Sequence, residues 1–330
     1  MFKDLKGYPE SVQIMTDSGF KFFKDVKSTD LILQINNRTL VGKYTDNFKI
    51  QKIYFKNDLL EIQTSQFNII CSLDTELVVT SDLKQRRGVN KVPIRENIPA
   101  HNVIPLTCTT NSKLNTDKEL SSLSNAQLTL AAILIQNTYT VRDYDLNSGV
   151  VTLHIETPKI YNLLRRTLTY LDIESTEEKR VNSNYIPYSI FKFKLPNYLN
   201  EIYNKHSLFQ IPKEWLNTLE LESKKHLVTV FSKFYDHNKV ISKNLYTVKR
   251  IQELACTSNI GSCNVINKFN DFLSLYVSSE LLSTSTKYLN EHKKLIPYSG
   301  YLYNIETPSG LILIKYKGTT CIASSLLIHI

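Results

Sequence analysis

The chain has 330 residues, of which 42% are hydrophobic, 22% charged and 10% aromatic. This composition excludes a disordered or fibrous protein and is typical of a folded chain with two or three domains. Forty Lys and Arg residues against 31 Asp and Glu residues give a net charge of +9, which favours contact with polyanions such as nucleic acid.

The sequence gives no sign of a membrane or secreted protein. The longest apolar run in the middle of the chain, Leu130–Ile135, is far shorter than the roughly 20 residues that span a bilayer. The N-terminus lacks the apolar core of a signal peptide. The five cysteines are odd in number and have no CxxC spacing, so we expect free thiols and no zinc site. The expected setting is the cytoplasm of a host cell, or a virion assembled inside a cell.

The first 80 residues alternate between apolar and polar positions in short segments, which is typical of strands. Strands are expected at Val12–Met15, Leu31–Ile35, Lys52–Phe55, Leu60–Thr64 and Phe67–Ser72. A basic, proline-containing segment follows between Lys84 and Leu114, with an extended piece around Pro105.

Helical patterns begin near residue 124. Ser124 and Gln127 fit a capping box, and an apolar stripe at helical spacing follows from Leu128 to Ile135. Further elements are expected as strands at Thr138–Tyr144 and Val150–Ile155, a helix from Pro158, a strand at Phe191–Leu195, and helices around Leu227–Phe234 and Lys249–Ala255.

Strands return between Gly300 and Ile330, with turns near Pro308–Gly310 and Lys317–Gly318. Two β-rich ends therefore flank a middle that mixes helices and strands. A single β domain interrupted by an inserted domain explains this arrangement.

Several stretches together resemble a large intein, in the order found in that family. SVQIMTDSGFKFFKDVKSTDLIL resembles the opening block of inteins and other Hint domains, and LYNIETPSGLILIKYKGTTCIASSLLIHI resembles their closing strands. LTLAAILIQNT and HLVTVFSKFYDHNKVI stand where the two helices of an inserted LAGLIDADG homing endonuclease belong. The resemblance implies an α+β fold, with a β-rich Hint-like domain formed by residues 1–114 and 293–330. It also implies an inserted αββαββα-type domain at 115–292, made of two pseudo-repeats at about 115–200 and 201–292.

Compared with that family, the splicing residues are replaced. Gly7 stands where a nucleophilic Cys or Ser is needed, and Thr75 stands in place of the histidine that polarises the scissile amide. Ile330 stands where an intein has the asparagine that cyclises. The resemblance thus predicts a chain that neither splices nor cleaves itself.

The nuclease residues are replaced in the same way. The acidic residues that end the two LAGLIDADG helices fall on Asn137 and Asn238, with Asp236 as a possible remnant acid. Neutral amides are poor Mg²⁺ ligands, because hard cations prefer carboxylates. We therefore expect no metal, no cofactor and no DNA cleavage.

Basic residues remain where the saddle-shaped sheets of the family meet duplex DNA, or flank them. The candidates are Arg86, Arg87, Arg95, Arg142, Lys192, Lys194, Lys243 and Lys249. The alternative is that these are ordinary solvated surface charges.

Three functions stay open. The first is a catalytically inactive relative of inteins that serves as a structural or binding component, with protein partners in a larger assembly such as a phage particle. The second is an active free-standing LAGLIDADG endonuclease that uses Asp236. The third is a non-catalytic DNA-binding regulator.

Overall fold

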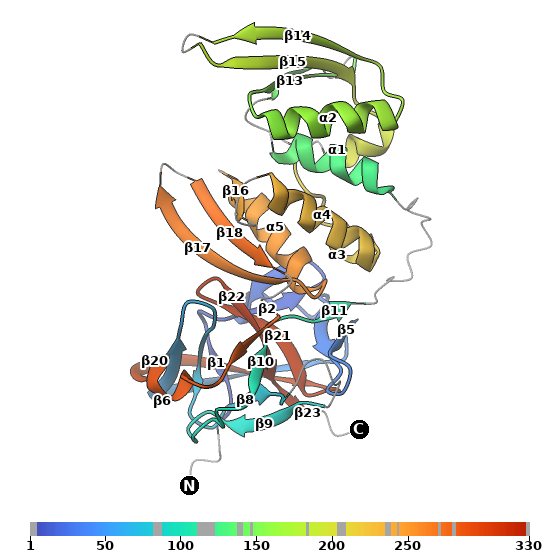
Figure 1. The fold of residues 1–330 in the computed structure, drawn as a ribbon. Coiled ribbons are helices and arrows are strands. Elements are labelled where there is room, and N and C mark those ends of the chain that lie inside the picture. The colour runs from blue at the N-terminus through green and yellow to red at the C-terminus, as the bar shows by residue number, and fades with distance from the viewer. Residues whose placement is uncertain are drawn as a thin grey trace.

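The computed structural model describes residues 5–81, 88–110, 123–136, 141–145, 148–182, 185–202, 209–234, 239–242, 244–269, 272–278 and 282–327 (Figure 1). The fold is α+β and rich in strands. Strands from the two chain ends form one β part, and the α-helices belong to the middle of the chain (Figure 1).

The N-terminal strands of the β part are short, with one exception. They are β1 (Tyr8–Pro9), β2 (Gln13–Thr16), β3 (Gly19–Phe22), β4 (Ile32–Ile35), β5 (Val41–Thr45), β6 (Lys49–Gln63), β7 (Asn68–Ser72), β8 (Glu76–Val79), β9 (Asn90–Pro93), β10 (Val103–Pro105) and β11 (Thr109–Thr110), with a 3₁₀ turn η1 (Phe23–Asp25) after β3. The C-terminal elements are β19 (Ser283–Ser285), the 3₁₀ turn η4 (Leu289–His292), β20 (Lys293–Thr307), β21 (Leu311–Tyr316), β22 (Thr319–Ser324) and β23 (Leu326–Leu327).

Strands from the two ends pair with each other. β2 pairs with β21, β1 and β6 both pair with β20, and β8 pairs with β22. Among the described residues, the prediction that both chain ends share one sheet system is therefore confirmed. The apolar cluster beneath these strands includes Val12, Ile62, Ile305 and Ile314, each fully buried.

β6 and β20 form a long antiparallel ribbon, in register from Lys49 opposite Glu306 to Ile62 opposite Lys293. The prediction of two separate strands at Lys52–Phe55 and Leu60–Thr64 is wrong. Asn57 and Asp58 lie between these two ranges, and both remain in the ladder opposite β20. Cross-strand pairing overrides the weak β-propensity of these two residues.

The end of the middle domain differs from the predicted boundary at residue 292. β19 pairs with β10, and the side chain of Asn290 exchanges two hydrogen bonds with the backbone of Ile98, at 3.0 and 3.1 Å. Residues 283–292 therefore lie with the β part, because their backbone partners are there.

The first half of the middle has the order α-β-β-α-β-β. Its elements are α1 (Asn125–Gln136), β12 (Val141–Asp145), β13 (Val150–Ile155), α2 (Pro158–Tyr170), β14 (Ser175–Val181) and β15 (Pro187–Lys194), followed by the 3₁₀ helix η2 (Asn197–Ile202). The strands form one antiparallel sheet in the order β12-β13-β15-β14. α1 and α2 lie on one side of this sheet (Figure 1).

The second half repeats this plan with one strand fewer among the described residues. Its elements are α3 (Trp215–Thr218), α4 (Leu221–Lys233), β16 (Lys239–Ser242), α5 (Leu245–Cys256), β17 (Gly261–Phe269) and β18 (Phe272–Ser278). The strand order β16-β18-β17 matches β13-β15-β14, and the described residues include no counterpart of β12. The predicted pseudo-repeats thus correspond in element order apart from that strand.

α1 lies at the centre of the middle domain. The predicted capping box is present, since the Ser124 backbone N–H donates to the Gln127 side chain at 2.7 Å and the Gln127 N–H donates back to Ser124 Oγ at 3.3 Å. Every residue from Leu128 to Ile135 is buried, not only the predicted stripe. α1 contacts both α2 and α4, and a helix enclosed in this way is apolar on all faces.

The second half-sheet joins the β part directly. β17 pairs with β22 at Cys263 opposite Thr319, so β16, β18 and β17 continue the large terminal sheet. The inserted domain is thus linked to the chain ends by strand pairing as well as by its connections.

Candidate functional site

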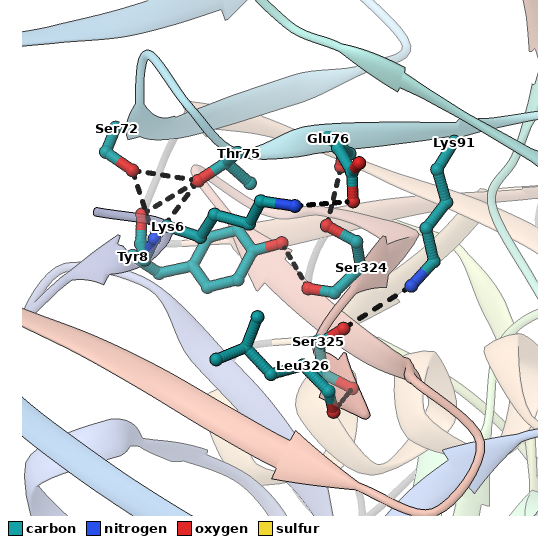
Figure 2. Close-up of polar contacts among 10 residues, drawn as sticks. Lys6, Tyr8, Ser72, Thr75, Glu76, Lys91, Ser324, Ser325 and Leu326 are labelled. Atoms are coloured by element: carbon teal, nitrogen blue, oxygen red, sulfur yellow. Dashed lines mark hydrogen bonds and ion pairs between the residues drawn. The ribbon is translucent and has the colours of Figure 1, made fainter. Parts of the chain in front are cut away.

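Gly7 and Thr75, far apart in the sequence, meet in the structure. Gly7 lies directly before β1, Ser72 ends β7, and Thr75 lies in the turn before β8. The Gly7 backbone N–H donates to Ser72 Oγ at 3.0 Å and to Thr75 Oγ1 at 3.1 Å, and the two hydroxyls are 2.9 Å apart (Figure 2). The Ser72 backbone N–H donates to the Gly7 carbonyl at 3.0 Å, so both polar groups of Gly7 have partners.

The space around Gly7 is tight for any side chain. A Cβ atom there would lie 3.1 Å from the Tyr303 carbonyl oxygen and 3.4 Å from Leu302 Cβ. A side chain at this position would therefore require the backbone of β20 to shift by a few tenths of an ångström. The hydroxyls of Ser72 and Thr75 hold the amide by hydrogen bonds alone.

The thiol nearest to this group in the chain is not activated. Cys71 precedes Ser72 and is fully buried, and burial raises the pKa of its thiol to about 12. Only a thiolate acts as a strong nucleophile, and this thiol stays protonated at neutral pH.

The C-terminal end of β22 contacts residues next to Gly7 and Thr75. The Tyr8 hydroxyl donates to the Ser324 carbonyl at 2.8 Å, and Ser324 Oγ donates to the Glu76 carbonyl at 2.8 Å (Figure 2). Lys6 pairs with the Glu76 carboxylate at 3.1 Å, and Lys91 Nζ lies 3.4 Å from the Ser325 carbonyl. We call Lys6, Gly7, Tyr8, Ser72, Thr75, Glu76, Lys91, Ser324 and Ser325 the chain-end cluster.

The chain-end cluster consists of hydrogen-bond donors and acceptors. None of its residues is a histidine or a cysteine. Burial lowers the pKa of Lys91, and the Glu76 carboxylate opposes that change. Ile330 lies outside the described residues. The arrangement joins strands from the two chain ends by hydrogen bonds.

The open face of the four-stranded sheet carries two of the predicted cations. Lys192 and Lys194 alternate along β15 with Phe191 and Phe193, which are buried against the helices. Both lysines are exposed. Thr152 of β13 and Thr176 of β14 lie directly beside Lys192, so small polar residues surround it.

The same face has an aromatic pair and one carboxylate that is paired with an arginine. His154 stacks on Tyr188 with ring centroids 5.4 Å apart. Glu178 is paired with Arg180 at 2.7 Å, and the Arg180 guanidinium lowers the pKa of this carboxyl. We call Thr152, His154, Thr176, Tyr188, Lys192 and Lys194 the sheet face.

Of the other predicted basic residues, Lys249 and Arg95 are the two whose side chains the structure describes, and neither belongs to this sheet. Lys249 is exposed on α5. Arg95, expected in a basic loop flanking the saddle, lies in the β part, where it pairs with Asp74 at 3.0 Å. Arg142 belongs to β12, but its side chain lies outside the description. Arg86, Arg87, Lys243, Asn137, Asn238 and Asp236 also lie outside the described residues.

The predicted nuclease centre therefore stays a prediction. Within the described ranges, no three His, Cys, Asp or Glu side chains are grouped as a metal site would require. Likewise, the described helices include none that is long and apolar enough to span a membrane.

Tyr8 and Ser324 were missed from the sequence. Their hydrogen bond joins residues 316 positions apart, and neither residue stands in a local pattern that indicates a polar contact.

No protein-family model and no curated protein matches the sequence. Among solved structures, the chain is similar to LAGLIDADG proteins over about half its length. I-DmoI in complex with its target DNA is 9% identical, with 51% of this chain and 97% of that chain covered and a TM-score of 0.33. Full-length DUF199/WhiA from Thermatoga maritima is 10% identical, with 52% and 60% covered and a TM-score of 0.31. The N-terminal LAGLIDADG domain of DUF199/WhiA is 11% identical, with 49% and 79% covered and a TM-score of 0.29.

Proposed function

We propose that this protein is a catalytically silent relative of LAGLIDADG-bearing inteins that acts by binding. Its chain ends form a closed Hint-like domain that does not process itself. Its central sheet contacts duplex DNA without cutting it.

The observation that carries the proposal is the environment of Gly7. Its amide is bound by the Ser72 and Thr75 hydroxyls, and the space beside its Cα is filled by β20. The position that holds a nucleophile in the family thus holds a glycine here, and its hydrogen bonds attach the start of β1 to the turn after β7. A backbone amide with two hydroxyl acceptors and no neighbouring thiolate or imidazole supports a structural role.

The binding part of the proposal rests on the sheet face. Two exposed lysines on adjacent outward positions of one rigid strand, next to threonine hydroxyls, suit contacts to a phosphate backbone. The net charge of +9 favours the approach of such a polyanion. Such contacts position a protein on DNA without requiring base recognition.

Self-processing is tested by placing the whole chain between two reporter domains and measuring intact masses. We expect only the unprocessed fusion at all incubation times. Ligated reporters, or a released N-terminal reporter, would refute the silent Hint domain.

DNA binding is tested by titrating mixed-sequence duplex DNA between about 50 and 200 mM salt, with and without Mg²⁺. Lys192→Ala and Lys194→Ala should each reduce the log–log salt slope by about 0.9. Lys179→Ala is the matched control, because Lys179 is exposed on β14 but belongs to the alternate set of positions, opposite Ser189. Mg²⁺-dependent strand breaks would favour the active-nuclease alternative, and equal effects of all three variants would argue against the sheet face.

A role within a larger assembly, such as a virus particle, is part of the same proposal. Copurification with a particle from cells that make the protein at its natural level would support it. Elution as a free protein of 38.1 kDa under those conditions would argue for a DNA-binding regulator instead.

A further inference from the structure

The β6–β20 ribbon has an exposed aromatic and basic surface that the proposed function does not use. In its register, Lys52 lies opposite Tyr303, Tyr54 opposite Tyr301, and Lys56 opposite Ser299. Directly opposed residues share one face of an antiparallel pair, so these side chains belong to a single surface. We call Lys52, Tyr54, Lys56, Ser299 and Tyr301 the ribbon face.

Two large aromatic rings are exposed on this face. Tyr54 is 60% exposed and Tyr301 is 39% exposed, while Tyr303 beside them is buried. Exposed aromatic side chains that neighbour one another on a rigid element are more typical of a binding surface than of a solvated one.

The ribbon face is held in one arrangement by its own contacts. The Tyr54 hydroxyl lies 2.9 Å from Ser299 Oγ, and the Tyr54 and Tyr301 rings meet edge to face at 5.6 Å. Lys52 Nζ lies 3.9 Å above the centre of the Tyr301 ring. Because these side chains are already ordered, a ligand would bind here with little further loss of conformational entropy.

Near its two exposed tyrosines the ribbon carries only positive charge, whereas Asp58, Glu61 and Glu306 lie further along the two strands. Residues 49–57 and 297–305 contain Lys49, Lys52 and Lys56 but no Asp or Glu. Lys52 and Lys56 each lie two residues from Tyr54, which is about 7 Å along an extended strand. An aromatic ring with an ammonium group on either side is complementary to a polyanion that also carries flat groups.

We propose that the ribbon face binds single-stranded nucleic acid, with an unpaired base stacked on Tyr54 and neighbouring phosphates bound by Lys52 and Lys56. Aromatic platforms with adjacent cations are a common means of binding single strands, because every base has a face that can stack. In a duplex the bases are already stacked on each other, so Tyr54 would have no such partner. This site is separate from the sheet face, since all of its residues belong to the β part.

The experiment measures fluorescence anisotropy of a labelled dT oligonucleotide of about 12 nucleotides with the full chain. Tyr54→Leu should weaken binding about 10-fold, whereas Tyr54→Phe, which keeps the ring, should leave affinity nearly unchanged. Lys52→Ala and Lys56→Ala should each reduce the salt slope by about 0.7. Lys49→Ala is the matched control, because Lys49 is exposed on the same ribbon but faces the opposite side, next to Glu306.

The test separates this site from the proposed duplex contact. Lys192→Ala should weaken duplex binding and leave dT binding unchanged, and Tyr54→Leu should do the reverse. If Lys49→Ala and Lys52→Ala changed dT binding equally, the ribbon would attract nucleic acid only through its general positive charge. That result would overturn the proposal. Absence of dT binding would also overturn it, as would a self-association that Tyr54→Leu abolishes, since the face would then be an interface between copies.

Discussion

The backbone N–H of Phe20 donates to the Glu253 carboxylate at 3.0 Å, joining residues 233 positions apart. Arg250 completes this contact between β3 and α5. Its guanidinium donates to Glu253 Oε2 at 2.7 Å and to the Ser18 carbonyl at 3.1 Å. Both side chains of the ion pair are nearly buried, so the inserted domain is fastened to the β part by a desolvated polar contact.

Gly19 is fitted to this contact, and its replacement should be costly. Its φ of +98° is unfavourable for any residue with a Cβ, and an added Cβ would overlap the Glu253 carboxylate. Gly19→Ala should lower the free energy of unfolding by about 2 to 3 kcal/mol, measured by chemical denaturation.

Gly149→Ala provides the control for Gly19→Ala. Gly149 also has a positive φ, +68°, but an added Cβ would meet only Lys194 Cγ at 4.0 Å. Its cost should be limited to backbone strain of about 1 kcal/mol. If the two variants lowered the free energy of unfolding equally, the Glu253 side chain would be able to move away from the added Cβ without cost.

The two hydroxyls that share the Gly7 amide should act as a unit. Ser72→Ala or Thr75→Val alone leaves this buried N–H one acceptor, so each should cost about 1 kcal/mol. The double variant leaves it none and should cost about 1 kcal/mol more than the sum of the single variants. A double-mutant cycle in urea measures this coupling, and strict additivity would contradict it.

Lys224 should make stability depend on pH. It is 1% exposed, and burial lowers its pKa to about 8. Below that pH the amine is charged in both states, and folding must desolvate it. Between about pH 8 and the unfolded value of 10.5, only the unfolded chain holds the proton, so stability from this group rises with pH.

Lys224→Met should remove this rise and stabilise the protein at about pH 7, by up to about 3 kcal/mol. Denaturation of both proteins at about pH 7 and pH 10 gives the difference. Lys225→Met is the control, because Lys225 is only partly buried and is paired with Glu222 on the same helix. A less stable Lys224→Met at neutral pH would show that the 3.2 Å bond to Thr110 Oγ1 outweighs desolvation.

Two helix starts allow a test of capping. Ser124→Ala removes the Oγ that accepts from the Gln127 N–H, one half of a reciprocal hydrogen-bond pair, and should cost about 1 kcal/mol. Thr157→Ala should cost less, because Thr157 precedes α2 without a side-chain hydrogen bond to its first turn. Thermal unfolding of both variants compares the two caps directly.

The helices were predictable because local sequence determines them. The capping box at Ser124 and the apolar spacing after it located α1 correctly, whereas the burial of all its faces depends on α2 and α4. β14 was missed because STEEKRV has no apolar alternation and all seven residues are exposed. It is a strand only because β15 supplies its hydrogen-bond partners.

The site was predictable only in part. Gly7 and Thr75 were both matched to functional positions of one family. In the structure the Gly7 backbone nitrogen lies 3.1 Å from Thr75 Oγ1. The apolar–polar alternation around β6 could not predict the contact between Tyr54 and Tyr301. That contact depends on the register between β6 and β20, whose paired residues, such as Tyr54 and Ser299, are nearly 250 positions apart in the sequence.

The β6–β20 pairing also determines the order in which the protein can fold during synthesis. The first half of the middle domain has its strands and helices close in sequence and can form as soon as it leaves the ribosome. β6 cannot form its ladder with β20 until β20 has been synthesised, more than 200 residues later. The pairing of β2 with β21 is delayed in the same way. Throughout that interval the edge of β6 that meets β20 and the edge of β2 that meets β21 are unpaired, so the nascent chain is most prone to aggregation just before β20 and β21 emerge.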